Sequence, residues 1–317
     1  LYAVVKSNAY GHGMEETVKI LNRDSPVDGF AVVNLDEALS VVSCTAKPIL
    51  ILSFWQKDRQ LVQKAIRNNI RFPVYDVRSA RWLAAQARAI GKRTLAHLKI
   101  DVGTLRFGIR FDDHAKLLPF FEIPGLIIES VFSHFADSES QSDGFTRLQY
   151  KRFESVCSFL AEKGFQFSRH IACSAAALRS RKYLADAMRL GIALYGLWPS
   201  PETKKAVSRY LTLEPALTWK THIIQVKEVR KGERVGYGST YRMPKNARLV
   251  VLPVGYWDGY DRKLSGKGEV LIGGYRCKVL GRVCMNMMMV DVSAVPNVNK
   301  NQEVILLGKD ARHVITA

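Results

Sequence analysis

The chain has 317 residues, of which 47% are hydrophobic, so it is long enough for one large domain and a smaller one with a sizeable core. Its 47 Lys and Arg residues against 29 Asp and Glu residues give a net charge of +18. The basic residues are scattered among carboxylates, with no long run of like charge and no known nucleic-acid-binding motif. We therefore expect a basic protein surface rather than a nucleic-acid partner.

The cysteines and the apolar runs exclude further classes. The five cysteines are widely spaced and include no C-x-x-C pair, which indicates reduced thiols rather than a disulfide framework or a zinc site. No uninterrupted apolar run is long enough to cross a bilayer, and no basic and apolar leader is present. We expect a soluble, cytoplasmic protein with no metal and no membrane partner. Because the chain begins at Leu1 without an initiator methionine, we also expect an excerpt of a longer polypeptide.

The first two thirds of the chain alternate predicted strands with helix-like segments. We predict strands at Tyr2–Val5, Phe30–Val33, Ile49–Ser53, Arg71–Val74, Ala96–Asp101, Leu126–His134, His170–Ala172 and Met188–Leu194. Eight strands is the number that closes a (β/α)8 barrel. In one intervening segment, Asn34 and Glu37 predict an N-cap and its capping partner for a helix through Val42.

Beyond Gly196 the pattern changes. Residues 199–205, which begin Pro-Ser-Pro, predict a linker. Alternation of period two then follows in four runs separated by glycine turns, at Ala216–Val229, Arg248–Val254, Gly268–Ile272 and Arg276–Val279. We predict an α/β fold, with a (β/α)8 TIM barrel at residues 1–208 and a smaller, mostly antiparallel β-domain at residues 209–317.

Candidate chemistry gathers where the predicted barrel strands end, because barrels keep their active sites at that edge. Lys6 ends the first strand, and a desolvated lysine there could act as a nucleophile, although a lysine that merely snorkels out of the strand end is the alternative. Other polar groups follow later strands, namely Arg106, His134, Ser174 and Arg189, with the backbone amides of Gly191 and Ile192. This set suits a phosphate-bearing carbonyl cofactor held as an imine. The absence of nucleotide, metal and nucleophile-elbow motifs favours the same interpretation by elimination.

An ordered series of motifs resembles the alanine racemases, which are fold-type III pyridoxal-phosphate enzymes. The series begins with the lysine segment Ala3–Gly13, whose core is VVKSNAYGHG. It continues with His97–Asp101 and Arg106, Ser133–Ala136, Ser174–Leu178, Arg189–Gly196, Val235–Gly238, Gly255–Gly259 and Gly281–Met285. The series covers nearly the whole chain in the family's order, which argues strongly against coincidence.

The resemblance implies a role for each matching residue. Lys6 would carry pyridoxal phosphate and act as acid/base on one face of the substrate α-carbon. Tyr237, contributed by the partner subunit of a homodimer, would act on the other face, because racemisation needs a base on each side. Arg189 would hydrogen-bond the pyridine nitrogen of the cofactor, and His134 would orient Tyr237 and Arg189.

Further residues would bind the cofactor phosphate, the substrate or both. Arg106 would contact the cofactor's phenolic oxygen and the substrate carboxylate, and Lys99, carbamylated in some family members, would steady that arginine. The phosphate would be held by Tyr10, Ser174, Gly191 and Ile192. Met285 and Tyr256 would line the substrate entrance from the partner chain.

We therefore interpret the chain as an alanine racemase that supplies D-alanine for peptidoglycan, with a small amino acid as substrate and composite active sites in a homodimer. The alternatives are a racemase of serine, lysine or broad specificity, a decarboxylase on the same barrel, and a non-catalytic pyridoxal-phosphate carrier. The family pattern has T-G-M-G before the arginine, whereas this chain has Val-Gly-Thr-Leu before Arg106. The pattern also has asparagine where this chain has Cys173, and aspartate where this chain has Asn286. These departures bear on substrate preference. The family also leads us to expect a helix before the lysine strand and a further C-terminal stretch.

Overall fold

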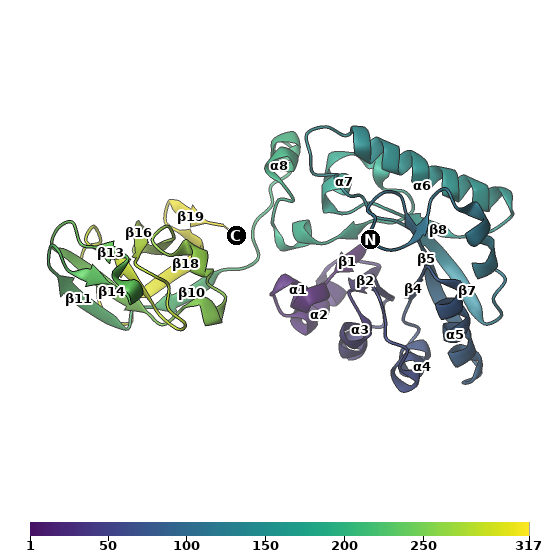
Figure 1. Cartoon of the computed structure of the whole chain (residues 1–317), viewed down its shortest axis with the longest axis horizontal. Helices are drawn as coiled ribbons and strands as arrows, with labels where there is room; N and C mark the ends of the chain where they lie inside the picture. The colour runs from purple at the N-terminus through teal and green to yellow at the C-terminus, as the bar shows by residue number, and fades with distance from the viewer. Residues whose placement is uncertain (317) are drawn as a thin grey trace. The chain divides into compact units, whose positions relative to one another are not determined.

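The computed structural model describes residues 1–316, which divide into two compact units, residues 1–214 and residues 215–316. Figure 1 shows the first unit as strands with helices on their outer side, and the second as a unit built mainly of strands. Among the described residues, no helix has the length and apolar character needed to span a membrane.

The first unit contains the predicted barrel. Within the described residues its eight parallel strands are β1 (Tyr2–Val4), β2 (Gly29–Val32), β3 (Ile49–Ile51), β4 (Phe72–Val74), β5 (Thr94–Asp101), β7 (Leu126–Phe132), β8 (Ser168–His170) and β9 (Arg189–Leu190). They form two arcs, β3-β2-β1-β9 and β4-β5-β7-β8, and the short strand β6 (Ile109–Arg110) pairs with β5. Parallel bridges between Leu50 and Arg71 and between His170 and Ala187 join the arcs. The prediction of a (β/α)8 barrel is confirmed.

Helices alternate with these strands and pack on them. They are α2 (Met14–Asp24), α3 (Leu35–Val41), α4 (Arg59–Arg67), α5 (Val77–Arg88), α6 (Gly144–Glu162), α7 (Ser174–Arg179) and α8 (Pro201–Val207). The predicted cap is confirmed, because the Asn34 side chain accepts a hydrogen bond from Glu37 N at 3.0 Å. The short 3-10 helices of the first unit are η1 (Val42–Cys44), η2 (His114–Lys116), η3 (Leu118–Phe120), η4 (Arg181–Tyr183) and η5 (Ile192–Tyr195). Those of the second unit are η6 (Tyr237–Ser239), η7 (Tyr256–Asp258) and η8 (Arg262–Leu264).

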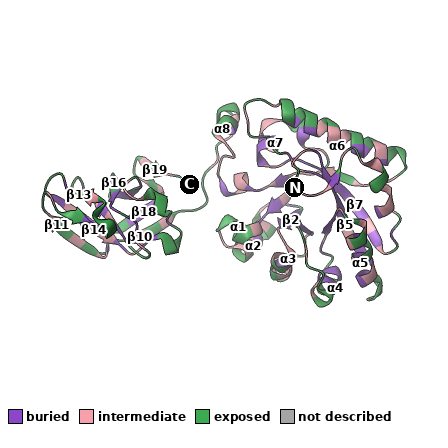
Figure 2. Cartoon of the chain, viewed as in Figure 1, coloured by how far each residue is buried: buried purple, intermediate pink, exposed green. Residues whose placement is uncertain are grey.

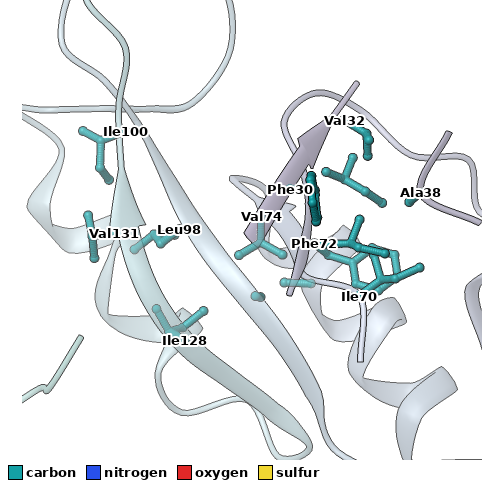
Figure 3. Packing of buried hydrophobic residues seen from close by; sticks show 14 of the residues in the cluster. Phe30, Val32, Ala38, Ile70, Phe72, Val74, Leu98, Ile100, Ile128 and Val131 are labelled. Atoms are coloured by element: carbon teal, nitrogen blue, oxygen red, sulfur yellow. The ribbon is translucent and has the colours of Figure 1, made fainter. Parts of the chain in front are cut away.

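The main core of the first unit lies between the strands and the helices. Phe30, Phe72, Leu98 and Val131 are among its fully buried side chains, and Figure 3 shows part of this packing. Burial of such side chains is the dominant stabilising contribution to a fold of this size. Figure 2 shows buried residues along the strands and exposed residues on the outer faces of the helices.

Strand β7 contains a register shift that decides which side chains enter the barrel. Ala96 of β5 pairs with Ile128, but the next residue, His97, pairs with Ser130, so Glu129 is the extra residue of a β-bulge. Ile128 packs in the helix-facing core before the shift and Val131 packs there after it. Because strand side chains alternate, this single extra residue turns Phe132 toward the barrel interior, where it contacts buried polar groups.

Two local predictions near the end of the first unit are wrong. Residues 199–205 do not form an irregular linker, because Pro201–Val207 is the helix α8, with Ser200 as N-cap accepting from Thr203 N at 3.0 Å. Proline is favourable at the first helical position, which explains the start. The last barrel strand is also shorter than predicted, since β9 ends at Leu190 and η5 begins at Ile192.

The second unit is an antiparallel β-structure, as predicted. Its strands are β10 (Trp219–His222), β11 (Gln225–Val229), β12 (Arg234–Val235), β13 (Tyr241–Arg242), β14 (Ala247–Leu252), β15 (Glu269–Ile272), β16 (Tyr275–Leu280), β17 (Met288–Asp291), β18 (Glu303–Asp310) and β19 (His313–Ile315). The main sheet has the order β10-β18-β15-β16-β17-β14-β11, β19 pairs with β18, and β12 pairs with β13. The run predicted at Ala216–Val229 is two strands at opposite ends of this order. Strands β12, β13 and β17 to β19 were not predicted.

Candidate active site

A cavity of about 390 Å³ lies at the C-terminal ends of the barrel strands. Its lining contains every site residue that the sequence predicted within the first unit, namely Lys6, Tyr10, Lys99, Arg106, His134, Ser174, Arg189, Gly191 and Ile192. The fold thus collects residues that are almost two hundred positions apart in the chain, because each follows or ends a parallel strand. The sequence reasoning missed Phe107, Phe132 and Glu139, which also line the cavity.

Lys6 is followed by a backbone turn of the opposite hand to an ordinary helix. Ser7, Asn8, Ala9 and Tyr10 have φ values of 54°, 53°, 54° and 56°, all in the left-handed region. Such conformations cost L-residues roughly 1–2 kcal/mol each, and four in succession are rare. Glu37 helps to hold the turn, since its carboxylate accepts from Ser7 N at 2.7 Å and from Val33 N at 2.8 Å. The turn carries both Lys6 and Tyr10 to the cavity.

Arg189 is a buried cation without a neighbouring anion. Its guanidinium donates to the carbonyl oxygens of Ser133 at 2.7 Å and Ile171 at 3.2 Å, and to His134 Nδ1 at 3.2 Å. None of the described carboxylates forms an ion pair with it. Burial lowers the pKa of Arg189 to about 10. The pKa of His134 falls well below its ordinary value, because of burial and because the cations Arg189, Lys99 and Arg106 lie nearby. His134 is therefore a neutral acceptor for Arg189.

Lys99 and Arg106 form a second basic pair in the cavity. The Lys99 ammonium nitrogen lies 4.3 Å from the centroid of the Phe132 ring. Burial, with the nearby Arg189 and Arg106, lowers the pKa of Lys99 well below its ordinary range. Burial of this kind favours the neutral form of the amine, in which the nitrogen can act as a nucleophile or a hydrogen-bond acceptor.

The loop that presents Arg106 is organised by Asp101 at the end of β5. The Asp101 carboxylate accepts hydrogen bonds from the backbone of Gly103 at 2.9 Å, Thr104 at 2.9 Å and Leu105 at 3.2 Å. Leu105 adopts a φ of 51°, so the chain turns sharply just before Arg106. This loop carries the departure from the family pattern, and its own carboxylate cap sets its conformation.

Backbone donors and hydroxyls meet at one corner of the cavity. Ser174 Oγ accepts from Gly191 N at 3.0 Å, which ties the start of α7 to the segment after β9. A Cβ atom added to Gly191 would lie 2.5 Å from the Tyr10 hydroxyl oxygen, so only glycine allows this approach. Tyr10 also packs on Tyr195, whose hydroxyl donates to Val4 O at 2.8 Å.

The donor set of the cavity fits a phosphorylated pyridine aldehyde. The hydroxyls of Tyr10 and Ser174, with the amides near Gly191, provide neutral hydrogen-bond donors for a phosphate. The Arg189 guanidinium provides a donor that keeps its proton, and Lys6 provides an amine for an aldehyde. The close approach at Gly191, which a side chain would fill, is consistent with a ligand held against backbone.

The remaining predicted residues belong to the second unit and lie on its neighbouring loops. Tyr237 begins η6 and its side chain is 72% exposed. Tyr256 begins η7, where Tyr256 N donates to Cys284 O at 3.1 Å, beside Met285. Tyr256 and Met285 are exposed by 39% and 51%. These loops present their polar and apolar side chains to solvent within the unit.

Family models match both units. The model of the alanine racemase N-terminal domain matches residues 1–199, and that of the C-terminal domain matches residues 216–317. An alanine racemase of Desulforamulus reducens is 39% identical over 312 residues, covering 97% of this chain and 83% of the relative. One of Carboxydothermus hydrogenoformans is 38% identical over 316 residues, covering 99% and 84%. Both relatives are named alanine racemases, which does not favour a racemase of another specificity or a non-catalytic pyridoxal-phosphate carrier.

A solved structure agrees with the fold over nearly the whole chain. The alanine racemase from Bacillus anthracis, determined with bound L-Ala-P, superposes with a TM-score of 0.90 at 32% identity. The match covers 99% of this chain and 80% of that one. The chain therefore belongs to the alanine racemase family, whose members are pyridoxal-phosphate-dependent isomerases.

Proposed function

We propose that this racemase uses Lys6 and Tyr237 as acid/base groups on opposite faces of the substrate α-carbon. The observation that carries the proposal is the cavity at the edge of the barrel, which Lys6 lines together with Arg106, His134 and Arg189. In this proposal residues 1–208 bind the cofactor and residues 209–317 supply the second base. Tyr237 is a reasonable donor for that role because its phenol is exposed and free to enter a partner's site.

The cofactor and the protein divide the chemistry. Bound pyridoxal phosphate supplies the electron withdrawal that makes the α-proton of an amino acid removable. Lys6 accepts that proton at its Nζ atom on one face, while the phenolic oxygen of Tyr237 delivers a proton on the other. Arg189 holds the pyridine nitrogen with a hydrogen bond, and it retains its own proton because a guanidinium is a very weak acid.

Substrate binding rests on the residues that flank these bases. Arg106 can hold the amino-acid carboxylate with paired hydrogen bonds. Tyr10, Ser174, Gly191 and Ile192 hold the phosphate.

We further propose that the molecule works as a homodimer, because the second base would then come from a partner chain. In the dimer, Tyr256 and Met285 from the partner would border the entrance. D-alanine made in the cytoplasm for peptidoglycan is the physiological role that we infer.

The test uses the cofactor-loaded enzyme in deuterated water with L-alanine. Wild type should yield D-alanine carrying deuterium at Cα. Tyr237→Phe should keep the absorbance of bound cofactor but lose racemisation, because a single remaining base can return hydrogen only to the face from which it removed the proton. Lys6→Ala should lose both the absorbance and the reaction.

Tyr275→Phe is the matched control, since Tyr275 is an exposed tyrosine on β16 of the same unit. It should racemise like wild type. Wild-type protein that is fully loaded yet forms no D-alanine, or a Tyr237→Phe variant with unchanged racemisation, would refute the proposed roles.

A further inference from the structure

Beneath Arg189, a chain of buried hydrogen bonds runs through the barrel toward its opposite end. Arg189 Nη1 contacts His170 Nδ1, and His170 Nε2 lies 2.9 Å from His97 Nδ1. His97 Nε2 in turn lies 3.2 Å from Glu129 Oε2. His170 and His97 are each 1% exposed, so water does not compete for the hydrogen bond between them. The chain thus links the cavity to a carboxylate outside it.

The chemistry of the two ends allows one arrangement of protons. A guanidinium has only donors, so Arg189 requires a lone pair on His170 Nδ1. An ionised carboxylate has only lone pairs, so Glu129 requires a proton on His97 Nε2. With both imidazoles neutral, His170 Nε2–H then donates to His97 Nδ1. Both histidines carry their proton on Nε2, and every bond points from Arg189 toward Glu129.

The surroundings keep both imidazoles neutral. The pKa of His170 lies well below its ordinary value, because of burial and the nearby Arg189, His97 and Lys99. Burial likewise lowers the pKa of His97, against the opposing effect of Glu129. Arg71, which contacts Glu129, and Arg189 also lower the pKa of His97. Rings pack on both imidazoles: Tyr2 lies 6.3 Å from His97 and 5.9 Å from His170 between centroids, and Phe132 stacks on His170 at 5.0 Å.

We infer that His97 and Glu129 are positioning residues, which hold His170 in the tautomer that accepts a hydrogen bond from Arg189 and so fix the guanidinium. The inference rests on the proposed role of Arg189 toward the cofactor. If His170 presented an N–H instead, two donors would face each other and Arg189 would have to rotate. A buried donor of Arg189 that lost its acceptor on His170 would stay without a hydrogen bond, which costs free energy.

The fold places Glu129 for this task. Glu129 is the extra residue of the β7 bulge, so it occurs where the regular alternation of the strand is interrupted. Arg71 holds its carboxylate from the other side, with Nε and Nη2 at 3.0 and 3.2 Å from its two oxygens. The side chain of Glu129 is 36% exposed, so the carboxylate keeps its charge at the solvent end of the chain.

Nitrogen-15 NMR of histidine-labelled protein at neutral pH tests the inference, because it distinguishes imidazole tautomers without any turnover. The chain has seven histidines, and single substitutions to glutamine assign the signals. In wild type, with and without cofactor, His97 and His170 should both be neutral Nε2–H tautomers. A protonated imidazole or an Nδ1–H tautomer at either position overturns the inference. Because this measurement uses the wild-type protein, it does not depend on whether the Glu129 variants fold.

Two substitutions separate the acceptor from the rest of the side chain. Glu129→Leu removes the acceptor, so a second tautomer should appear at His97 and kcat should fall about tenfold, the factor expected for one lost buried hydrogen bond, with KM within about twofold. Glu129→Gln keeps an acceptor oxygen and should restore the wild-type tautomers and most of kcat. Glu154→Leu is the control, because it removes a carboxylate on α6 that takes no part in the hydrogen bonds from Arg189 to Glu129. It should change neither the histidine tautomers nor kcat.

Unchanged tautomers and unchanged kcat in Glu129→Leu would overturn the positioning role. Failure of the proposed two-base function is recognised separately, since it would show as normal racemisation by Tyr237→Phe while the tautomers of wild type still obey the predicted order.

Discussion

Replacing Ser7 by glycine should stabilise the protein, although glycine usually weakens folded structure. Ser7 has φ 54° and ψ 52° in the left-handed turn after Lys6, and its side chain is exposed. Glycine removes a conformational cost of roughly 1–2 kcal/mol. It also adds roughly 0.5–1 kcal/mol of backbone entropy to the unfolded chain. The net expectation is a gain of about 0.5–1 kcal/mol in the free energy of unfolding.

Ser40→Gly is the matched control for this experiment. Ser40 is also an exposed serine, but it lies in the right-handed helix α3, where glycine costs about 0.5 kcal/mol relative to serine. For a unit of this size, Ser7→Gly should raise Tm by about 1–4 °C and Ser40→Gly should lower it slightly. Thermal unfolding followed by circular dichroism, with and without pyridoxal phosphate, measures both. A decrease in Tm for Ser7→Gly comparable to that for Ser40→Gly would refute the argument from backbone strain.

Three further predictions concern the cavity and the end of the buried chain. Gly191→Ala should raise the Kd for pyridoxal phosphate about tenfold, because its Cβ would displace the Tyr10 hydroxyl; an absorbance titration measures it, and unchanged affinity contradicts it. Asp101→Ala should raise KM for alanine more than it lowers kcat, because the loop before Arg106 loses its cap; equal effects on both would argue against this role. The hydrogen bond from His97 and the nearby Arg71 lower the pKa of Glu129 from 4.5 to about 2, so its stabilising contribution is present above pH 4.5 and lost as the pH falls toward 2. Glu129→Gln should flatten the acid limb of a Tm-against-pH curve, and an unchanged limb would contradict the assignment.

The local pattern of the sequence by itself determined much of this protein. The eight barrel strands occur within a few residues of the predicted positions, because short β-branched runs alternating with helical segments are a local signal. The end of the first strand also marked Lys6, and ordered motifs identified nine of the first-unit residues that line the cavity. In the second unit, the local pattern did not predict β12, β13 and β17 to β19. Strands β17 and β18 take their place in the main sheet from partners far away in the chain.

The tertiary structure alone decided how several of these residues are held. The segment from Ser7 to Tyr10 contains no glycine, so its left-handed turn has no local sign; contacts such as that with Glu37 impose it. The extra residue in β7 is Glu129, which nothing in the local pattern marks as a bulge, yet it reverses which side chains face the barrel. The order of protons from Arg189 to Glu129 depends on four residues from four strands. Periodicity reports the environment of one segment, whereas these features arise only where distant segments meet.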